Sequence, residues 1–155
     1  MIQRVQSIWL LLATLVLVLM LFFPIASKEV NGSTSQAFTN GLHYYDTTKA
    51  GKPLTVDVFL PLIIIHVAII LMCFINIFNF KRRTFQKRAS IITIIFIGGF
   101  AFWCSVFAKD LPGGVEGATF GVGAYMPALA ILFIVLAIFG INKDERLIRS
   151  AERLR

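Results

Sequence analysis

The sequence contains few charged residues and few of the side chains that bind metals or perform catalysis. Charged residues make up 15% of the 155 positions, against about a quarter in soluble domains, and there are only 2 cysteines and 2 histidines. No C-x-x-C pair, P-loop, dinucleotide fingerprint or acyl-transfer triad is present. We therefore expect a protein that is not an enzyme, binds no cofactor and has no metal site.

Long apolar runs dominate what is present. Hydrophobic residues make up 57% of the chain, and they are concentrated at residues 5–26, 58–79, 89–108 and 120–141. Each run reaches the length of about 20 residues that a helix needs to cross a bilayer. The first run is longer than the apolar part of a signal peptide, so we expect it to be retained. The sequence predicts an all-α membrane protein, a single domain built as a bundle of four transmembrane helices.

The positions of the charges predict the orientation of this bundle. The net charge is +7, and the basic excess lies at Arg4, in KRRTFQKR at 81–88, and in residues 142–155. The two loops on the opposite side contain a few lysines among a similar number of acids. The positive-inside rule therefore predicts that both termini are cytoplasmic. Because the basic residues flank apolar runs and lack interleaved aromatics, we expect no nucleic-acid partner.

Residues 27–57 form the one sizeable loop outside the predicted helices. The segments GLHYYDTT (41–48) and PLTVDVF (53–59) are rich in β-branched and aromatic residues, and KAGK (49–52) separates them. This pattern predicts a small β-hairpin in the first extracytoplasmic loop. A lone hairpin is marginally stable in water, so it would rest on the helix ends or on a partner.

His66 is the ionisable residue that we expect deepest in the membrane, where such residues are functional candidates. A haem, a metal or a proton relay would each need further ligands or carboxylates that the apolar runs do not supply. The alternative is a neutral histidine that hydrogen-bonds a neighbouring helix through Tyr125 or a backbone carbonyl. Cys73 and Cys104 are expected at different depths, too far apart for a disulfide.

Small residues predict where helices approach one another closely. Gly98 and Gly99 lie in the third apolar run, and Gly121 and several alanines lie in the fourth. Helices in lipid associate through van der Waals packing, which small residues favour. We therefore expect contact faces on the third and fourth helices, within the bundle or against other subunits.

The segment from 142 to 155 predicts a cytoplasmic, basic, amphipathic helix. Its apolar residues recur at helical spacing, with basic residues on the flanks. One interpretation is an interfacial segment on anionic lipid, and the other is a docking site for a protein partner. The candidate partner-contact residues are Arg146, Leu147, Ile148, Arg149, Ala151, Arg153 and Leu154.

Three segments carry a family resemblance: MIQRVQSIWLLLA (1–13), INIFNFKRRTFQ (75–86) and LAIFGINKDERLIRSAERLR (136–155). With them the chain resembles an uncharacterised family of small four-helix inner-membrane proteins of Bacteroidota, a domain-of-unknown-function family. The resemblance covers the whole chain. It implies a multi-pass protein of the bacterial inner membrane and supplies no activity and no site residues.

Two functions remain open at this point. The first is a non-enzymatic accessory or scaffolding subunit of a larger membrane complex, whose partners are the lipid bilayer and other proteins. The alternative is a small carrier or a lipid- or quinone-binding protein with a cavity near His66.

Overall fold

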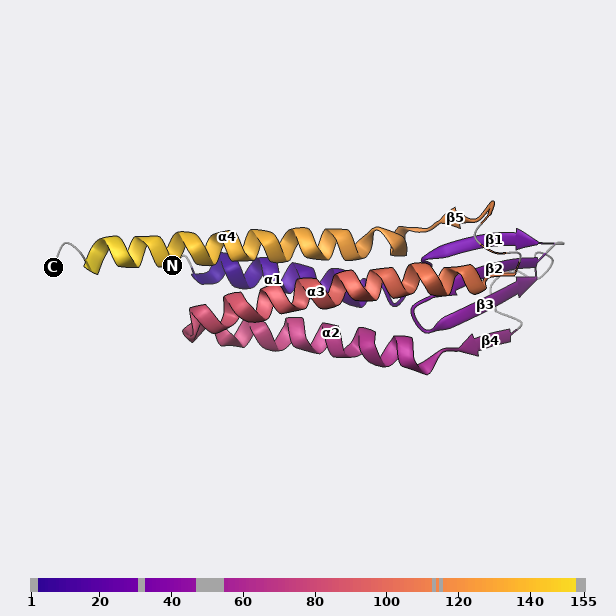
Figure 1. The fold of residues 1–155 in the computed structure, drawn as a ribbon, viewed down its shortest axis with the longest axis horizontal. Coiled ribbons are helices and arrows are strands. Elements are labelled where there is room, and N and C mark those ends of the chain that lie inside the picture. The colour runs from indigo at the N-terminus through magenta and orange to yellow at the C-terminus, as the bar shows by residue number, and fades with distance from the viewer. Residues whose placement is uncertain (1–2, 31–32, 47–54, 113, 115, 153–155) are drawn as a thin grey trace.

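In the residues that the structure describes, four helices and a five-stranded sheet make up the fold (Figure 1). The computed structural model describes residues 3–30, 33–46, 55–112, 114 and 116–152, with the backbone alone for 3–4, 30, 46, 81 and 147–152. Its elements are α1 (Gln3–Leu19), β1 (Ala26–Val30), β2 (Ser33–Phe38), β3 (Gly41–Asp46), β4 (Thr55–Val58), α2 (Leu60–Phe78), α3 (Arg83–Phe107), β5 (Thr119–Phe120) and α4 (Met126–Glu152). Short 3₁₀ turns follow α2 and α3 and precede α4.

The helices lie side by side, and the sheet sits at one end of them (Figure 1). The start of α1, the turn between α2 and α3, and the end of α4 all lie at the opposite end, which we call the charged end. The charged end carries the basic segments of the sequence. The arrangement therefore agrees with a bundle whose two termini face the same side.

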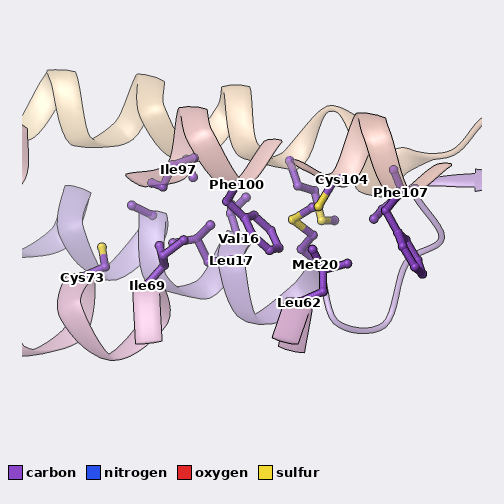
Figure 2. Close-up of a cluster of buried hydrophobic side chains, with 14 of the residues drawn as sticks. Val16, Leu17, Met20, Leu62, Ile69, Cys73, Ile97, Phe100, Cys104 and Phe107 are labelled. Carbon is purple, nitrogen blue, oxygen red and sulfur yellow. The ribbon is translucent and has the colours of Figure 1, made fainter. Parts of the chain in front are cut away.

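Each helix buries one row of residues at alternating spacings of four and three, the spacing of closely packed antiparallel helices. The rows are Gln6, Leu10, Ala13 and Leu17 in α1; Leu62, His66, Ile69, Cys73 and Asn76 in α2; Gln86, Ser90, Thr93, Ile97, Phe100, Cys104 and Phe107 in α3; and Ala130, Ile134, Ala137, Ile141 and Asp144 in α4. Figure 2 shows Leu17, Ile69 and Phe100, from three different helices, meeting in this core.

The strands are ordered β4-β3-β2-β1-β5, and all neighbours are antiparallel. Ala26 of β1 pairs with Ala37 of β2, which pairs with Leu42 of β3. All three side chains belong to the buried core. One face of the sheet therefore packs on the end of the helix bundle.

This sheet shows that the predicted all-α fold with a small hairpin was wrong. The two predicted hairpin strands correspond to β3 and β4 and do pair, but their predicted turn lies outside the described residues. The polar segment before them adds β1 and β2, and the second loop adds β5. The sequence did not predict β2 because one of its buried positions is Ser35. The strand therefore lacks the alternation of large apolar residues that indicates a half-buried strand. The fold is a mixed one of helices and an antiparallel sheet.

The helices also differ from the predicted runs. Among the described residues, α2, α3 and α4 are long and apolar enough to cross a membrane, whereas α1 is a shorter apolar helix. At 17 residues, α1 extends about 25 Å, and the chain then turns toward Pro24 and enters β1. α3 begins at Arg83, so most of KRRTFQKR is helix and not loop.

Candidate functional site

A layer of buried polar side chains lies at the charged end of the bundle. It consists of Gln6, Asn76, Gln86, Ser90 and Asp144, each at most 5% exposed. All four helices contribute, because each of the buried rows ends or begins with a polar residue at this end. We call these five residues the polar layer.

Within the polar layer, α2 and α3 are joined by reciprocal hydrogen bonds. The Asn76 amide donates to the Ser90 hydroxyl at 2.9 Å and to the Gln86 backbone carbonyl at 3.2 Å. The Gln86 amide donates to the Asn76 backbone carbonyl at 3.2 Å, and the Ser90 hydroxyl donates to the Gln86 carbonyl at 2.9 Å. Buried amides need such partners in an apolar surrounding. The contacts hold the α2–α3 turn closed.

The other half of the polar layer joins α1 to α4. The Gln6 side-chain amide donates to a carboxylate oxygen of Asp144, and the carboxylate's second oxygen has no hydrogen-bond partner among the described residues. A Cβ added at Gly140 would lie 3.1 Å from the Gln6 side chain, so a glycine gives Gln6 its space. The pair fixes how α1 and α4 are aligned.

Asp144 belongs to the segment 142–155 that the sequence predicts to be a cytoplasmic helix, and the structure buries its side chain. The sequence contained a pattern that predicts this burial. Asp144 continues a row of residues at spacings of four and three, which consists of Ala130, Ile134, Ala137 and Ile141. In the described part of the chain, no group of three or more histidines, cysteines or acids gathers as a metal site would require.

His66 lies fully buried in the middle of α2, and its ring stacks on Phe100 of α3 at 4.8 Å between ring centres. Neither ring nitrogen makes a hydrogen bond of ordinary geometry, although the ring interacts with the backbone of Leu17. The predicted bond to Tyr125 does not form, because the Tyr125 side chain is 68% exposed. His66 is thus a packed core residue whose polar contact among the described residues is with the Leu17 backbone.

The two cysteines are free and buried. Figure 2 shows Cys73 and Cys104 at different positions along the bundle, with Ile69 and Phe100 between them. The prediction that they are too far apart to form a disulfide is consistent with this arrangement.

The predicted partner-contact residues lie on a direct continuation of α4. The helix runs without a break from Met126 to Glu152, and its last part projects beyond the other helices (Figure 1). Arg146 is exposed and borders a cavity of about 340 Å³ with Lys87, Asn142 and Glu145. The backbone of Leu147, Ile148, Arg149 and Ala151 belongs to the same helix, whereas Arg153 and Leu154 lie outside the described residues.

An apolar groove runs along the outside of α2 and α3. Two adjoining cavities of about 400 Å³ and about 660 Å³ share Ala68 and Met72, and together they reach from Trp103 to Arg88. We call them the α2–α3 groove. Gly98 and Gly99, which sequence reasoning placed in a contact face, have open space where a Cβ would be, and Gly99 lines the groove. Among the described residues, therefore, no helix packs on that face.

At the sheet end, β4 forms an exposed edge. All four of its residues, Thr55 to Val58, are exposed, and Val58 is 59% exposed. On the adjacent β3, burial raises the pKa of Tyr44, and the Asp57 carboxylate raises it further. Partial burial lowers the pKa of His43, which lies 3.0 Å from the Asn40 amide oxygen. At neutral pH, the edge thus presents valines and one carboxylate, next to uncharged rings.

Comparison with known proteins places this chain in a family. Residues 2–154 match a family described as "Domain of unknown function (DUF4293)". No curated protein matches the chain. The match confirms the resemblance to an uncharacterised family, and it spans nearly every residue of the sequence. The chain belongs to the DUF4293 family.

Proposed function

We propose that this protein is a non-enzymatic, multi-pass protein of the bacterial inner membrane that serves as an accessory or scaffolding subunit of a larger complex. Its three long apolar helices support a place in the membrane. The observation that carries the proposal is the rigid attachment of an exposed sheet to the helix bundle. Such a sheet can hold a partner at a constant position relative to the membrane.

The attachment is rigid because three connections between sheet and helices are short and hydrogen-bonded. After α1, the Ile25 amide donates to the Ala37 carbonyl at 2.7 Å. Before α2, the Phe59 amide donates to the Asn40 carbonyl at 3.1 Å, and the Phe59 ring packs on Phe107 at 5.2 Å between ring centres. The third connection, before α4, is hydrogen-bonded to the first one. With these connections in place, the sheet cannot swivel freely on the bundle.

The third connection packs backbone against backbone. The Gly121 amide donates to the Ile25 carbonyl at 2.9 Å, and the Gly123 amide donates to the Pro24 carbonyl at 3.0 Å. Glycines are needed here because a Cβ at Gly123 would lie 2.7 Å from the Phe23 carbonyl oxygen. The segments before β1 and before α4 are therefore locked together.

The exposed edge of the sheet supports a partner of a particular kind. β4 lies at one end of the strand order and pairs with β3 alone among the described strands. An edge strand with free backbone groups can accept an extended segment of another protein. Val56 and Val58, which are 40% and 59% exposed, would contact side chains of that segment.

The orientation follows from the basic residues at the charged end, which the positive-inside rule assigns to the cytoplasm. The sheet would then face the extracytoplasmic side. We expect a membrane-impermeant maleimide to label Thr55→Cys in intact cells, and Arg82→Cys only after the membrane is opened. Both positions are exposed, and the background is a protein with Cys73 and Cys104 replaced by alanine. Labelling of Arg82→Cys alone in intact cells would reverse the orientation.

The α4 extension supports a cytoplasmic contact. Because α4 continues straight past the other helices, its last turns project beyond the bundle (Figure 1). Deleting residues 146–155 while keeping Lys143 to Glu145 is expected to leave membrane insertion intact and to reduce the partner protein retained per chain. Quantitative mass spectrometry of the tagged protein, purified in mild detergent, measures this ratio.

The control for this truncation is a charge-preserving variant that replaces residues 146–155 by a scrambled sequence of the same composition. A contact made by specific side chains is lost in both variants, whereas anchoring by charge alone survives scrambling. If the truncated chain inserts and keeps its partners at the original ratio, the tail acts only as an anchor.

A second candidate function is the binding of a lipid or quinone near His66. The observation that favours it is the α2–α3 groove, because Phe100 both lines the groove and stacks on His66. His66 itself is fully buried, so a ligand in the groove would meet Phe100 first.

A further inference from the structure

We propose that the α2–α3 groove binds one anionic phospholipid, with its phosphate at Arg88 and an acyl chain along Met72, Ala68 and Gly99. The inference specifies the ligand of the second candidate function and rests on the proposed membrane placement of α2 and α3. It concerns a site on the outer face of the bundle, away from the sheet, and it shares only Asn76 with the polar layer.

The groove has the length and lining that an acyl chain requires. Along α2 and into the turn that follows it, the groove reaches from Ile65 to Asn79, about 21 Å at 1.5 Å per residue. One leaflet of a bilayer contributes about 15 Å of hydrocarbon thickness. The groove is longer than this, so the whole acyl chain of a lipid from one leaflet can lie in it. The lining consists almost entirely of aliphatic and aromatic side chains. The hollow arises in part where Ala68 and Gly99 have little or no side chain.

Charged and polar groups occur at one end of the groove only. Arg88, Asn79 and Asn76 line the part next to the α2–α3 turn, and no acid is among the described residues that line the groove. The planar guanidinium of arginine binds phosphate oxygens through two parallel hydrogen bonds. Arg88 is exposed and lies in the second turn of α3, where its long side chain can reach the headgroup level. A lipid with a net negative headgroup therefore complements both ends of the site.

Charge also distinguishes a lipid from a second copy of the chain. In a membrane, two copies related by a two-fold axis would place both Arg88 residues at the same depth on the shared face. Like charges would then face each other across the interface. A second copy would therefore be repelled at this end of the groove, whereas an anionic lipid would be attracted to Arg88.

The test uses the purified full chain in nanodiscs made from equal parts of phosphatidylglycerol and phosphatidylethanolamine. Native mass spectrometry after release counts the lipids of each class that stay bound. The wild-type chain is expected to retain about one phosphatidylglycerol in preference to phosphatidylethanolamine, whose headgroup has no net charge. Arg88→Gln is expected to lower this preference about fivefold, the effect of one interfacial basic residue.

Matched variants separate the site from general effects of charge and bulk. Arg82→Gln removes an exposed charge at the same end but outside the groove lining, and it is expected to change the preference less than twofold. Gly99→Leu fills the groove and is expected to remove the bound lipid, whereas Gly98→Leu, also in open space but outside the lining, is expected to retain it.

Each other outcome would overturn the inference in a recognisable way. Equal loss of preference in Arg82→Gln and Arg88→Gln would mean a diffuse charge effect, and retention of both lipids without preference would leave only an unspecific lipid groove. Absence of any retained lipid would remove the lipid-binding form of the second candidate function as well. A dimer that disappears in Gly99→Leu would identify a second copy as the occupant.

Discussion

Replacing Gly123 by alanine is expected to destabilise the folded protein severely, by at least about 3 kcal/mol. The added Cβ would lie 2.7 Å from the Phe23 carbonyl oxygen and 2.8 Å from the Pro24 carbonyl oxygen. Both neighbours are backbone atoms, which cannot rotate aside as a side chain could. Relief of the clash requires the two segments to separate, and this breaks the 3.0 Å hydrogen bond from the Gly123 amide to Pro24.

The measurement is the unfolding temperature of the purified protein in detergent, where a loss of this size corresponds to a decrease of about 10 °C. Gly98→Ala is the matched control, because no atom lies within 4 Å of the Cβ that it adds and alanine favours the helix. We expect the control to unfold at the wild-type temperature or above it. An unchanged unfolding temperature for Gly123→Ala would show that the segments before β1 and before α4 are not locked together.

Gln6→Leu is expected to cost about 3 kcal/mol, because it leaves the buried Asp144 carboxylate without its hydrogen-bond donor. Leucine fills the space of the glutamine side chain but cannot donate a hydrogen bond. The free energy of unfolding can be measured by titrating a denaturing detergent into a mild one. Loss of the donor should reduce it without changing membrane insertion, since the net charge of the segment stays the same.

The double variant Gln6→Leu with Asp144→Leu is the decisive control. Removing both partners also removes the buried charge, so the double variant is expected to regain most of the lost stability. The coupling free energy between the two positions should then reach about 2 kcal/mol. If the two single effects simply add, Gln6 and Asp144 do not act as a pair.

The apolar runs predicted the long helices because membrane crossing is a matter of length and composition, which the sequence displays directly. The sheet could be predicted only in part. β3 and β4 carry aromatic and β-branched residues, whereas β1 and β2 are rich in serine, threonine and charged residues. Their pairing depends on contacts with β3 and with the end of the bundle, and no local sequence pattern predicts such contacts.

The observed helix boundaries differ from the predicted ones for a related reason. The charged segment before Ala89 suggested a loop, but Gln86 and Ser90 are buried against Asn76, and this contact extends α3 back to Arg83. At the other end, the glycines of 121–123 approach the backbone near Pro24, so α4 starts only at Met126. In both cases a contact between distant segments overrides the local composition.

The candidate sites also include some features that the sequence could predict and others that it could not. The burial of Asp144 follows from the spacing of its helix row and could have been predicted, but its partner Gln6 requires knowledge of how α1 lies against α4. The α2–α3 groove could not be predicted, because it depends on which faces of two helices remain uncovered. The contact role of Arg146 and its neighbours remains a prediction.

The most direct test of the proposed scaffolding role is the native mass of the tagged, full-length chain purified from its own membranes in mild detergent. We expect a species well above the 17.3 kDa of one chain, with a second polypeptide present in constant ratio through a further separation step. The ratio of this second polypeptide should fall when residues 146–155 are deleted. A homogeneous monomer that carries only lipid, recovered under conditions that preserve other membrane complexes of the same cells, would contradict the proposed role.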